Sequence, residues 1–244
     1  MMTENMIPQE KAKFPFSMIE GMMPWYPWIG LMGWMIVLIS LLVGLFALSP
    51  AVQTFFSDAK VVREAAGAGS AIVVANVAAH VTETWVPSFK IFGLGLGLLS
   101  IMMALGTIAK RLREMGFVIV NNIKVSLRPA LPSIPKRVRA FQLIALMGVM
   151  VLMIALIIGI VLAVTVVPSY WNNSIANDLN PAQPGSALLG QLSTIASYTF
   201  WLNPLRMIGM AFLFTGITVA LTVILDTLRV QAKSLVGFYE NVTG

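Results

Sequence analysis

Four uninterrupted apolar stretches are the sequence feature that most restricts how this chain can fold. A helix needs about 20 apolar residues to cross a hydrocarbon core of about 30 Å, and each stretch has roughly that length. Because lipid offers no partners for backbone polar groups, each stretch is predicted to be a helix. The predicted spans are approximately residues 28–48, 91–109, 141–167 and 207–225. The chain is 58% apolar and only 11% charged, which indicates an integral membrane protein.

The second half of the chain is similar to the first at a spacing of 115 or 116 residues. Gly69-Ser70-Ala71 recurs as Gly185-Ser186-Ala187, and Trp85 recurs as Trp201. Four further pairs match in the same way: Gly33 with Gly148, Gly44 with Gly159, Lys90 with Arg206, and Gly93 with Gly209. Internal similarity of this kind is typical of one structural unit followed by its copy. We therefore predict an all-α fold in which a two-span hairpin occurs twice in tandem.

Each predicted repeat includes an extra-cytoplasmic helix before its second span. Ser70 and Ser186 are suitable N-caps for the helix-compatible runs that follow them. Four prolines mark predicted helix ends or bends: Pro50 and Pro168 after the first spans, and Pro87 and Pro204 before the second spans. The predicted organisation is an interfacial N-terminal segment, repeat 1, a basic proline-containing loop, repeat 2 and a C-terminal tail, at residues 1–27, 28–113, 114–140, 141–229 and 230–244.

Basic residues orient the predicted spans. The loop between the second and third spans has one acid, Glu114, against eight basic residues: Lys110, Arg111, Arg113, Lys124, Arg128, Lys136, Arg137 and Arg139. Such a loop is expected in the cytoplasm, and with four spans both termini are expected there too. We expect the cytoplasmic (inner) membrane of a prokaryote. This topology and contact with anionic lipids account for the net charge of +6, so no nucleic-acid partner is expected.

The sequence is poor in groups that perform chemistry. It has no cysteine and one histidine, which excludes disulfides, thiolate metal sites and cysteine nucleophiles within the chain. His80 is either a packed or interfacial histidine or one ligand of a metal site shared with a partner. The chain also has no glycine-rich phosphate loop, nucleophile elbow or paired carboxylates. We therefore expect no autonomous enzyme activity and no cofactor or metal bound by this chain alone.

Small and interfacial residues are the candidate contact sites for lipid or partner proteins. Small residues four apart allow helices to approach closely and occur as Ser40/Gly44, Gly93/Gly97 and Ala155/Gly159. They serve packing within the chain or contact with a subunit or lipid. Lys90 and Arg206 either extend to headgroups or bind an anionic ligand, lipid or partner carboxylate. Trp85 and Trp201 are predicted at the outer interface, and Asp226 is predicted to pair with Arg229 three residues later.

These features favour a non-catalytic accessory subunit of a larger membrane complex, with other membrane proteins and phospholipids as partners. The spans would form a scaffold and the outer helices a docking surface. The alternative is a small oligomeric channel or carrier with a path between the two repeats. A path of that kind needs polar lining, for which the candidates are Ser40, Ser100, Thr107, Thr215, Thr218 and Thr222.

Overall fold

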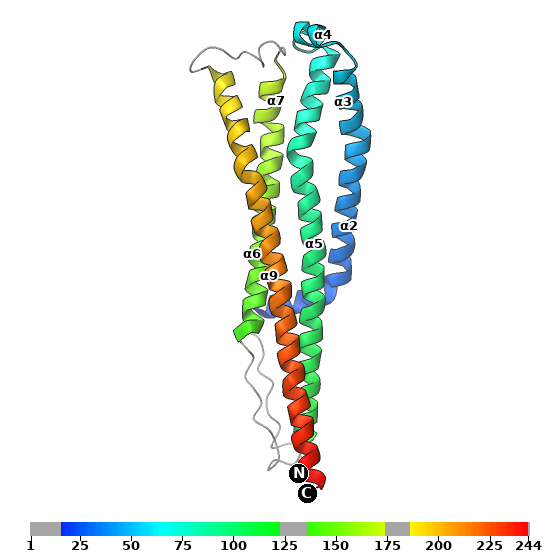
Figure 1. The fold of residues 1–244 in the computed structure, drawn as a ribbon, viewed down its shortest axis with the longest axis vertical. Helices are drawn as coiled ribbons and strands as arrows, with labels where there is room; N and C mark the ends of the chain where they lie inside the picture. The colour runs from blue at the N-terminus through cyan, green and yellow to red at the C-terminus, as the bar shows by residue number, and fades with distance from the viewer. Residues whose placement is uncertain (1–15, 123–135, 174–185, 244) are drawn as a thin grey trace. The chain divides into compact units, whose positions relative to one another are not determined.

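The computed structural model describes residues 16–122, 136–173 and 186–243, and these form helices joined by short turns and loops, without strands (Figure 1). The elements are α1 Phe16–Met22, the 3-10 turn η1 Met23–Trp25, α2 Tyr26–Val43, the π-helical turn η2 Gly44–Leu48, α3 Ser49–Phe56, α4 Lys60–Ala65, α5 Ala71–Asn122, α6 Lys136–Val164, α7 Val166–Trp171 and α9 Ala187–Thr243. Most of the predicted N-terminal segment, the centre of the basic loop and the second outer segment between residues 174 and 185 lie outside the described residues.

Within the described ranges, four helical segments are long and apolar enough to cross a membrane. They comprise Ile19–Phe56, Ala71–Val118, Arg137–Trp171 and Ala187–Lys233. Each contains one of the predicted spans and extends beyond it, because the flanking residues continue the helix. The prediction of an all-α protein with four membrane-spanning helices is thus confirmed by length and composition for the described chain.

The second and fourth spans continue directly from the predicted outer helices. The structure differs here from the sequence prediction, since Pro87 lies inside α5 and Pro204 lies inside α9 without ending either helix. A proline removes one backbone hydrogen bond and crowds one preceding carbonyl, and long apolar helices tolerate this. The helix also continues past residue 229, so the described part of the predicted C-terminal tail belongs to α9.

The two serines predicted as N-caps do cap their helices. The backbone N–H of Val73 donates to Ser70 Oγ at 3.4 Å, and that of Leu189 donates to Ser186 Oγ at 3.3 Å. Each hydroxyl thereby satisfies one of the backbone donors that the first turn of a helix leaves unpaired. Both helices begin at the alanine that follows the serine.

Pro50 and Pro168 distort their helices one turn upstream instead of ending them. The π-helical turn Gly44–Leu48 precedes Pro50, and α6 ends at Val164, four residues before Pro168. A proline ring clashes with the carbonyl four residues earlier, which explains why both irregularities lie at that distance. The helical path resumes as α3 and α7, so the first span of each predicted repeat is longer than expected.

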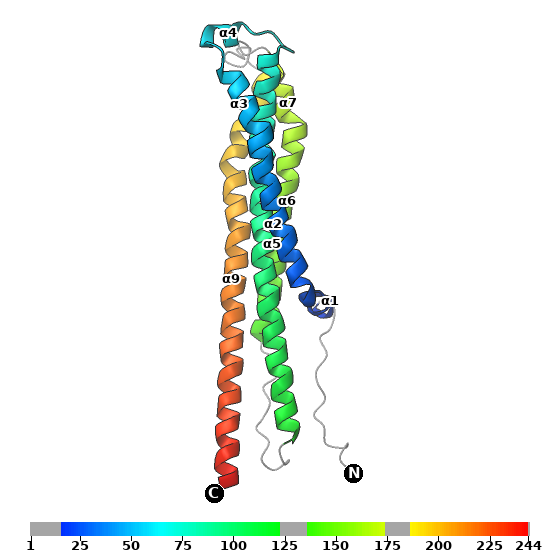
Figure 2. The ribbon, with the colours of Figure 1, turned by 90° about the vertical axis from the view of Figure 1, so that its right-hand side faces the viewer.

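The chain divides into two compact units. The first unit contains Met1–Gly30, Leu98–Met147 and Phe212–Gly244, and the second contains Leu31–Gly97 and Gly148–Ala211. In the first unit α1 is a short helix that η1 connects to the start of α2 (Figure 2). There Met23 is buried, and a Cβ added at Gly106 would lie 3.0 Å from its methyl carbon. The glycine thus makes room for a methionine that joins the N-terminal turn to α5.

Two glycine contacts bring helices close together in the second unit. A Cβ added at Gly33 would lie 2.6 Å from the carbonyl oxygen of Gly93, so the α2 and α5 backbones touch (Figure 1). A Cβ added at Gly209 would lie 2.7 Å from Leu152 and 3.3 Å from the carbonyl oxygen of Gly148, so α6 and α9 are similarly close. The four glycines match between the two halves of the sequence, Gly33 with Gly148 and Gly93 with Gly209.

Candidate functional site

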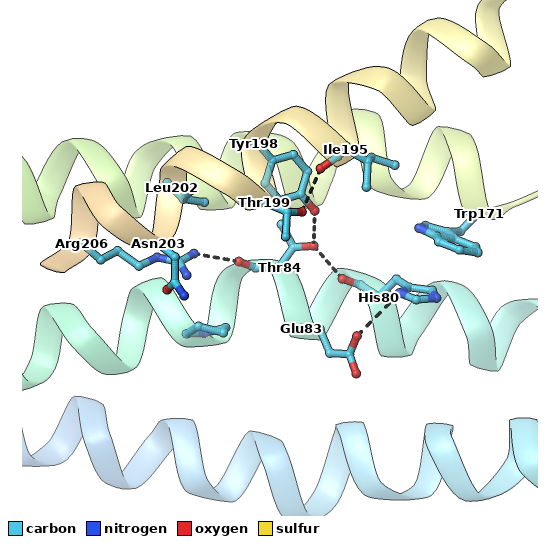
Figure 3. A pocket seen from close by; sticks show the side chains of 11 residues that line it. His80, Glu83, Thr84, Trp171, Ile195, Tyr198, Thr199, Leu202, Asn203 and Arg206 are labelled. Carbon is cyan, nitrogen blue, oxygen red and sulfur yellow. Dashed lines mark hydrogen bonds and ion pairs between the residues drawn. The ribbon is translucent and has the colours of Figure 1, made fainter.

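A cleft in the second unit is lined by α5, α7 and α9. Its volume is about 490 Å³, within the range of small-molecule pockets. The lining residues combine polar, aromatic and apolar side chains: His80, Glu83, Thr84, Pro87, Trp171, Ile195, Tyr198, Thr199, Leu202, Asn203 and Arg206 (Figure 3). Because α5 and α9 supply most of this lining, their facing sides determine the chemistry of the cleft.

Arg206 is the most unusual residue of the cleft, because it is only 7% exposed in the middle of a long apolar helix. Its Nε donates to Ser88 Oγ at 2.9 Å, and its Nη2 donates to Ser88 Oγ at 2.5 Å and to the carbonyl oxygen of Thr84 at 3.4 Å. The side chain therefore points across to α5. Nη1 has no hydrogen-bond partner among the described residues.

A glycine and a tyrosine shape the surroundings of Arg206. A Cβ added at Gly159 would lie 2.6 Å from Ser88 Oγ, so α6 leaves the space that the serine hydroxyl occupies. Thr84 Oγ1 donates to the carbonyl oxygen of His80 at 2.7 Å and lies 3.1 Å from the Tyr198 hydroxyl. Since the threonine proton is already engaged, the tyrosine hydroxyl is the donor in that contact. These bonds fix the polar wall of the cleft between α5 and α9.

An aromatic pair and an acid form another part of the cleft. The rings of His80 and Trp171 stack with centroids 3.7 Å apart and planes inclined by 13°. Glu83 Oε2 lies 3.6 Å from His80 Nδ1, and the glutamate side chain is 55% exposed. The described residues contain no group of three or more His, Asp or Glu side chains suited to a metal ion. The proposed sharing of His80 with a partner's metal stays a prediction.

The electrostatic character of the cleft comes from an arginine that lacks a carboxylate partner. None of the ion pairs between described residues involves Arg206. A guanidinium keeps its charge inside proteins, and burial of an unpaired ion costs several kcal/mol (an order-of-magnitude estimate) unless hydrogen bonds or a counter-ion compensate. The serine hydroxyl and threonine carbonyl provide part of that compensation. The remaining edge of the guanidinium is suited to an anionic group.

Lys90 and Arg206 have different environments in the structure, although they occupy matching positions in the two halves of the sequence. Lys90 is exposed on α5, whereas Arg206 is buried against Ser88 instead of extending outward. Trp85 is half-buried and makes an edge-on contact with Phe89, with ring centroids 5.6 Å apart. Trp201 is 44% exposed. Lipid or partner contact through these residues stays a prediction.

The small residues predicted as contact faces are used unequally within the chain. Gly93 and Gly97 pack against α2. A Cβ added at Gly33 would lie 2.6 Å from the Gly93 carbonyl oxygen and 2.9 Å from the Gly97 backbone nitrogen. The remaining residues differ: Ser40 is buried with its hydroxyl donating to the Ile36 carbonyl, Ala155 is buried, Gly159 adjoins Ser88, and a Cβ at Gly44 would meet nothing within 4 Å. Packing within the chain therefore occupies most of these positions.

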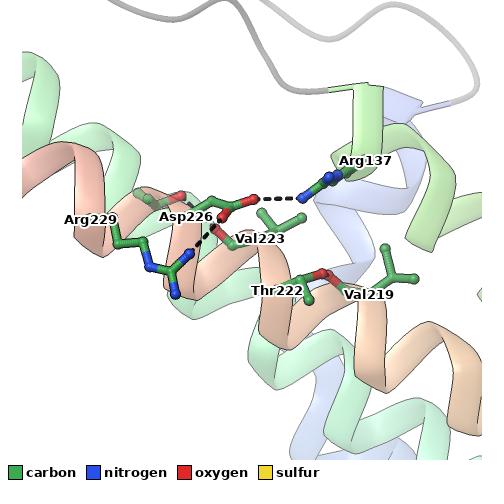
Figure 4. Close-up of polar contacts among 7 residues, drawn as sticks. Arg137, Val219, Thr222, Val223, Asp226 and Arg229 are labelled. Carbon is green, nitrogen blue, oxygen red and sulfur yellow. Dashed lines mark hydrogen bonds and ion pairs between the residues drawn. The ribbon is translucent and has the colours of Figure 1, made fainter.

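Asp226 forms the main ion-pair cluster of the first unit. Its Oδ2 lies 2.8 Å from Arg137 Nη1, and its Oδ1 lies 3.9 Å from Arg229 Nη1 (Figure 4). The predicted pair with Arg229 is present, but the closer contact joins α9 to α6. Arg137 is 89 positions from Asp226, so no local sequence pattern indicates this pair.

We expect the Arg137–Asp226 pair to contribute little to stability, because its side chains are 65% and 45% exposed. Exposed ion pairs typically contribute about 0.2–1 kcal/mol. A double-mutant cycle with Arg137→Gln and Asp226→Asn, measured by unfolding in mixed micelles, should give a coupling free energy in that range. A coupling well above it would show that the pair is buried by lipid or by a partner.

Several of the hydroxyls considered for a transport path bind their own helices. Thr107 Oγ1 donates to the carbonyl oxygen of Met103, Thr218 Oγ1 to that of Phe214, and Thr222 Oγ1 to that of Val219. Thr215, Thr218 and Thr222 are exposed on α9. This is the usual way in which apolar helices accommodate hydroxyl side chains. A path between the predicted repeats gains no specific support from these contacts.

The residues that position Arg206 were not among those predicted from the sequence. Thr84 and Ser88 lie one helical turn apart on α5, and Tyr198 comes from α9 two turns before the arginine. The signal available in the sequence was a pair of hydroxyls four residues apart in a largely apolar stretch, which places both on one helix face. Nothing in the sequence indicated that this face meets the arginine.

Comparison of the chain with protein-family models, curated proteins and solved structures finds no match. Function is therefore inferred from the geometry of the molecule.

Proposed function

We propose that the protein is a non-catalytic subunit of a larger membrane complex and that it docks to a helix of another membrane protein through α2. The observation that carries the proposal is a row of large apolar side chains along α2 and η2. The row consists of Leu31, Trp34, Leu38, Leu41 and Leu45, which are 48–68% exposed. These residues are spaced alternately three and four positions apart. The same spacing occurs along the contact between two helices that pack as a left-handed coiled coil.

Packing against the rest of the chain uses only one side of α2. Gly33 and Ser40 are buried on that side, and Ile36 contacts Gly93 of α5. In the most apolar 18-residue window of the first span 11% of residues are buried, against 28–33% in the other three. The opposite side of α2 is therefore available for another helix. In a membrane, such a face contacts either lipid or another helix.

Trp34 favours a protein partner over lipid alone at this face. It is 68% exposed, and its indole N–H has no hydrogen-bond partner among the described residues. If Trp28 lies at the membrane interface, Trp34 lies about 9 Å deeper along the helix. An indole N–H at that depth is costly without an acceptor. A neighbouring helix can provide both an acceptor and a surface for the ring.

The remainder of the proposal follows the sequence pattern. The glycine contacts of Gly33 with Gly93 and of Gly148 with Gly209 support a duplicated two-span unit, since matching positions make matching contacts. The basic loop supports cytoplasmic termini in a prokaryotic inner membrane. All four predicted spans lack Asp, Glu, Lys, Arg and His in their interiors, as expected of a scaffold rather than a transporter or enzyme.

The docking face is tested with the double variant Trp34→Ala/Leu38→Ala. We expect the native protein, purified in mild detergent, to contain a second membrane protein in a fixed stoichiometric ratio, measured by native mass spectrometry. The double variant should lose at least 90% of that partner (about tenfold, or about 1.4 kcal/mol of binding free energy). The matched control is Met153→Ala/Ile157→Ala, which removes two exposed apolar side chains four residues apart on α6.

Two results would contradict this function. One is a native protein that is a stable monomer in mild detergent and in lipid nanodiscs. The other is equal loss of the partner in the α2 and α6 double variants, because the contact would then not depend on the α2 face.

A further inference from the structure

The cleft beside Arg206 has the features of a binding site for a charged ligand, independently of docking through α2. Two donors of the guanidinium, Nε and Nη2, are bonded to α5, and this fixes the plane of the group. The remaining nitrogen, Nη1, has no partner among the described residues. An arginine held in this way is pre-organised to bind a phosphate or carboxylate oxygen, because its planar fork matches oxyanions.

We propose that the cleft binds the headgroup of a zwitterionic phospholipid, with its phosphate on Arg206 and its ammonium group near Glu83. The cleft lies on three of the segments that are suited to cross a membrane, so a ligand that resides in the membrane can reach it. Leu202, Ile195 and Pro87 provide apolar wall for the glycerol and upper acyl region. Tyr198 and Asn203 add polar groups near the phosphate.

The choice of a zwitterion rests on the second charge of the cleft. Glu83 lines the same cleft and is 55% exposed, and its distance of 3.6 Å from His80 is longer than a hydrogen bond. Along α5, Glu83 lies five residues before Ser88, which corresponds to about 7.5 Å of helix rise. Arg206 from α9 and Glu83 from α5 thus place a positive and a negative group in the lining of one cleft (Figure 3). A headgroup with a net negative charge would be repelled by Glu83, whereas an ammonium group would pair with it.

The aromatic pair supports the same placement of the ammonium group. Trp171 stacks on His80 beside Glu83, and both rings line the cleft. Indole faces attract cations, and ammonium groups are commonly bound between aromatic rings and a carboxylate. The arrangement thus provides separate recognition for each charge of the headgroup.

Lipid retention measured by native mass spectrometry tests the site. The intact protein is purified in a neutral detergent and mixed with equal amounts of phosphatidylethanolamine and phosphatidylglycerol. We expect phosphatidylethanolamine to be the retained lipid and Arg206→Gln to reduce its bound fraction at least tenfold. Lys90→Gln is the matched control, since it removes an exposed cation from the corresponding position of the first predicted repeat, and it should change retention less than twofold. Glu83→Gln should reverse the preference toward phosphatidylglycerol.

Three outcomes would overturn the site. Arg206→Gln could retain the lipid at the native level, or the native protein could prefer phosphatidylglycerol. The third outcome is that soluble glycerophosphoethanolamine binds as tightly as the lipid, because the ligand would then be a soluble zwitterion. If Arg206→Gln fails to fold, Glu83→Gln still tests the proposal, because Glu83 is exposed and its replacement should be tolerated. An unchanged preference of Glu83→Gln for phosphatidylethanolamine would contradict the proposal.

Discussion

Replacement of Tyr170 by alanine is expected to lower the free energy of unfolding by about 3–5 kcal/mol, the range found for large buried aromatic side chains. Tyr170 is only 1% exposed and is the largest of the fully buried side chains in the described structure. It makes an edge-on contact with Trp171, with ring centroids 5.0 Å apart. Its removal would leave a cavity in a closely packed interior, where the lost contacts cannot be replaced by lipid.

The measurement is equilibrium unfolding in micelles of dodecyl maltoside and increasing dodecyl sulfate, followed by circular dichroism. The matched control is Phe200→Ala, because Phe200 is an aromatic residue of the same unit that is 82% exposed. We expect the control to stay within about 0.5 kcal/mol of the native protein. Equal losses in both variants would show that Tyr170 is not enclosed by the fold.

The variant Gly33→Ala is expected to be the second most destabilising change, by about 1–3 kcal/mol, as is typical of overpacking. The new Cβ would lie 2.6 Å from the Gly93 carbonyl oxygen and 2.9 Å from the Gly97 backbone nitrogen. Both neighbours are backbone atoms, so no side chain can rotate to make room. The α2 and α5 helices would have to separate along the contact that joins them.

Gly44→Ala is the control for this prediction and is measured by the same unfolding assay. A Cβ at Gly44 would meet nothing within 4 Å, so the substitution tests the change in chain entropy without a clash. It is expected to be neutral or slightly stabilising. If Gly33→Ala behaved like this control, the close approach of α2 and α5 would be contradicted.

The parts of the fold that could be predicted from the sequence depend on local pattern. Four apolar stretches were sufficient to predict four helices, because lipid leaves the backbone no other way to satisfy its polar groups. Ser70 and Ser186 marked the first turns of α5 and α9, since a capping hydroxyl acts on residues two or three positions away. Of the small residues predicted to allow close approach of helices, Gly93 and Gly97 do so, because they contact α2 at Gly33.

The parts that could not be predicted depend on contacts between residues far apart in the chain. Lys90 and Arg206 match in the sequence, yet only Arg206 is buried, because Ser88 on α5 accepts its hydrogen bonds and Gly159 on α6 leaves the necessary space. No local pattern records which helices meet. Proline also misled the prediction of helix ends, since propensity measured in water overstates its effect within long apolar helices.

The length of α9 has a consequence for any protein that contacts its C-terminal end. Its 57 residues correspond to about 86 Å of helix, whereas a bilayer with its headgroups is about 40–45 Å thick. If the predicted span 207–225 crosses the membrane, the part of α9 beyond it, about 27 Å of helix, would project into water on the C-terminal side as a stalk. Because a helix has a fixed rise per residue, such a stalk would hold a protein bound at its C-terminal end at a fixed distance from the membrane surface.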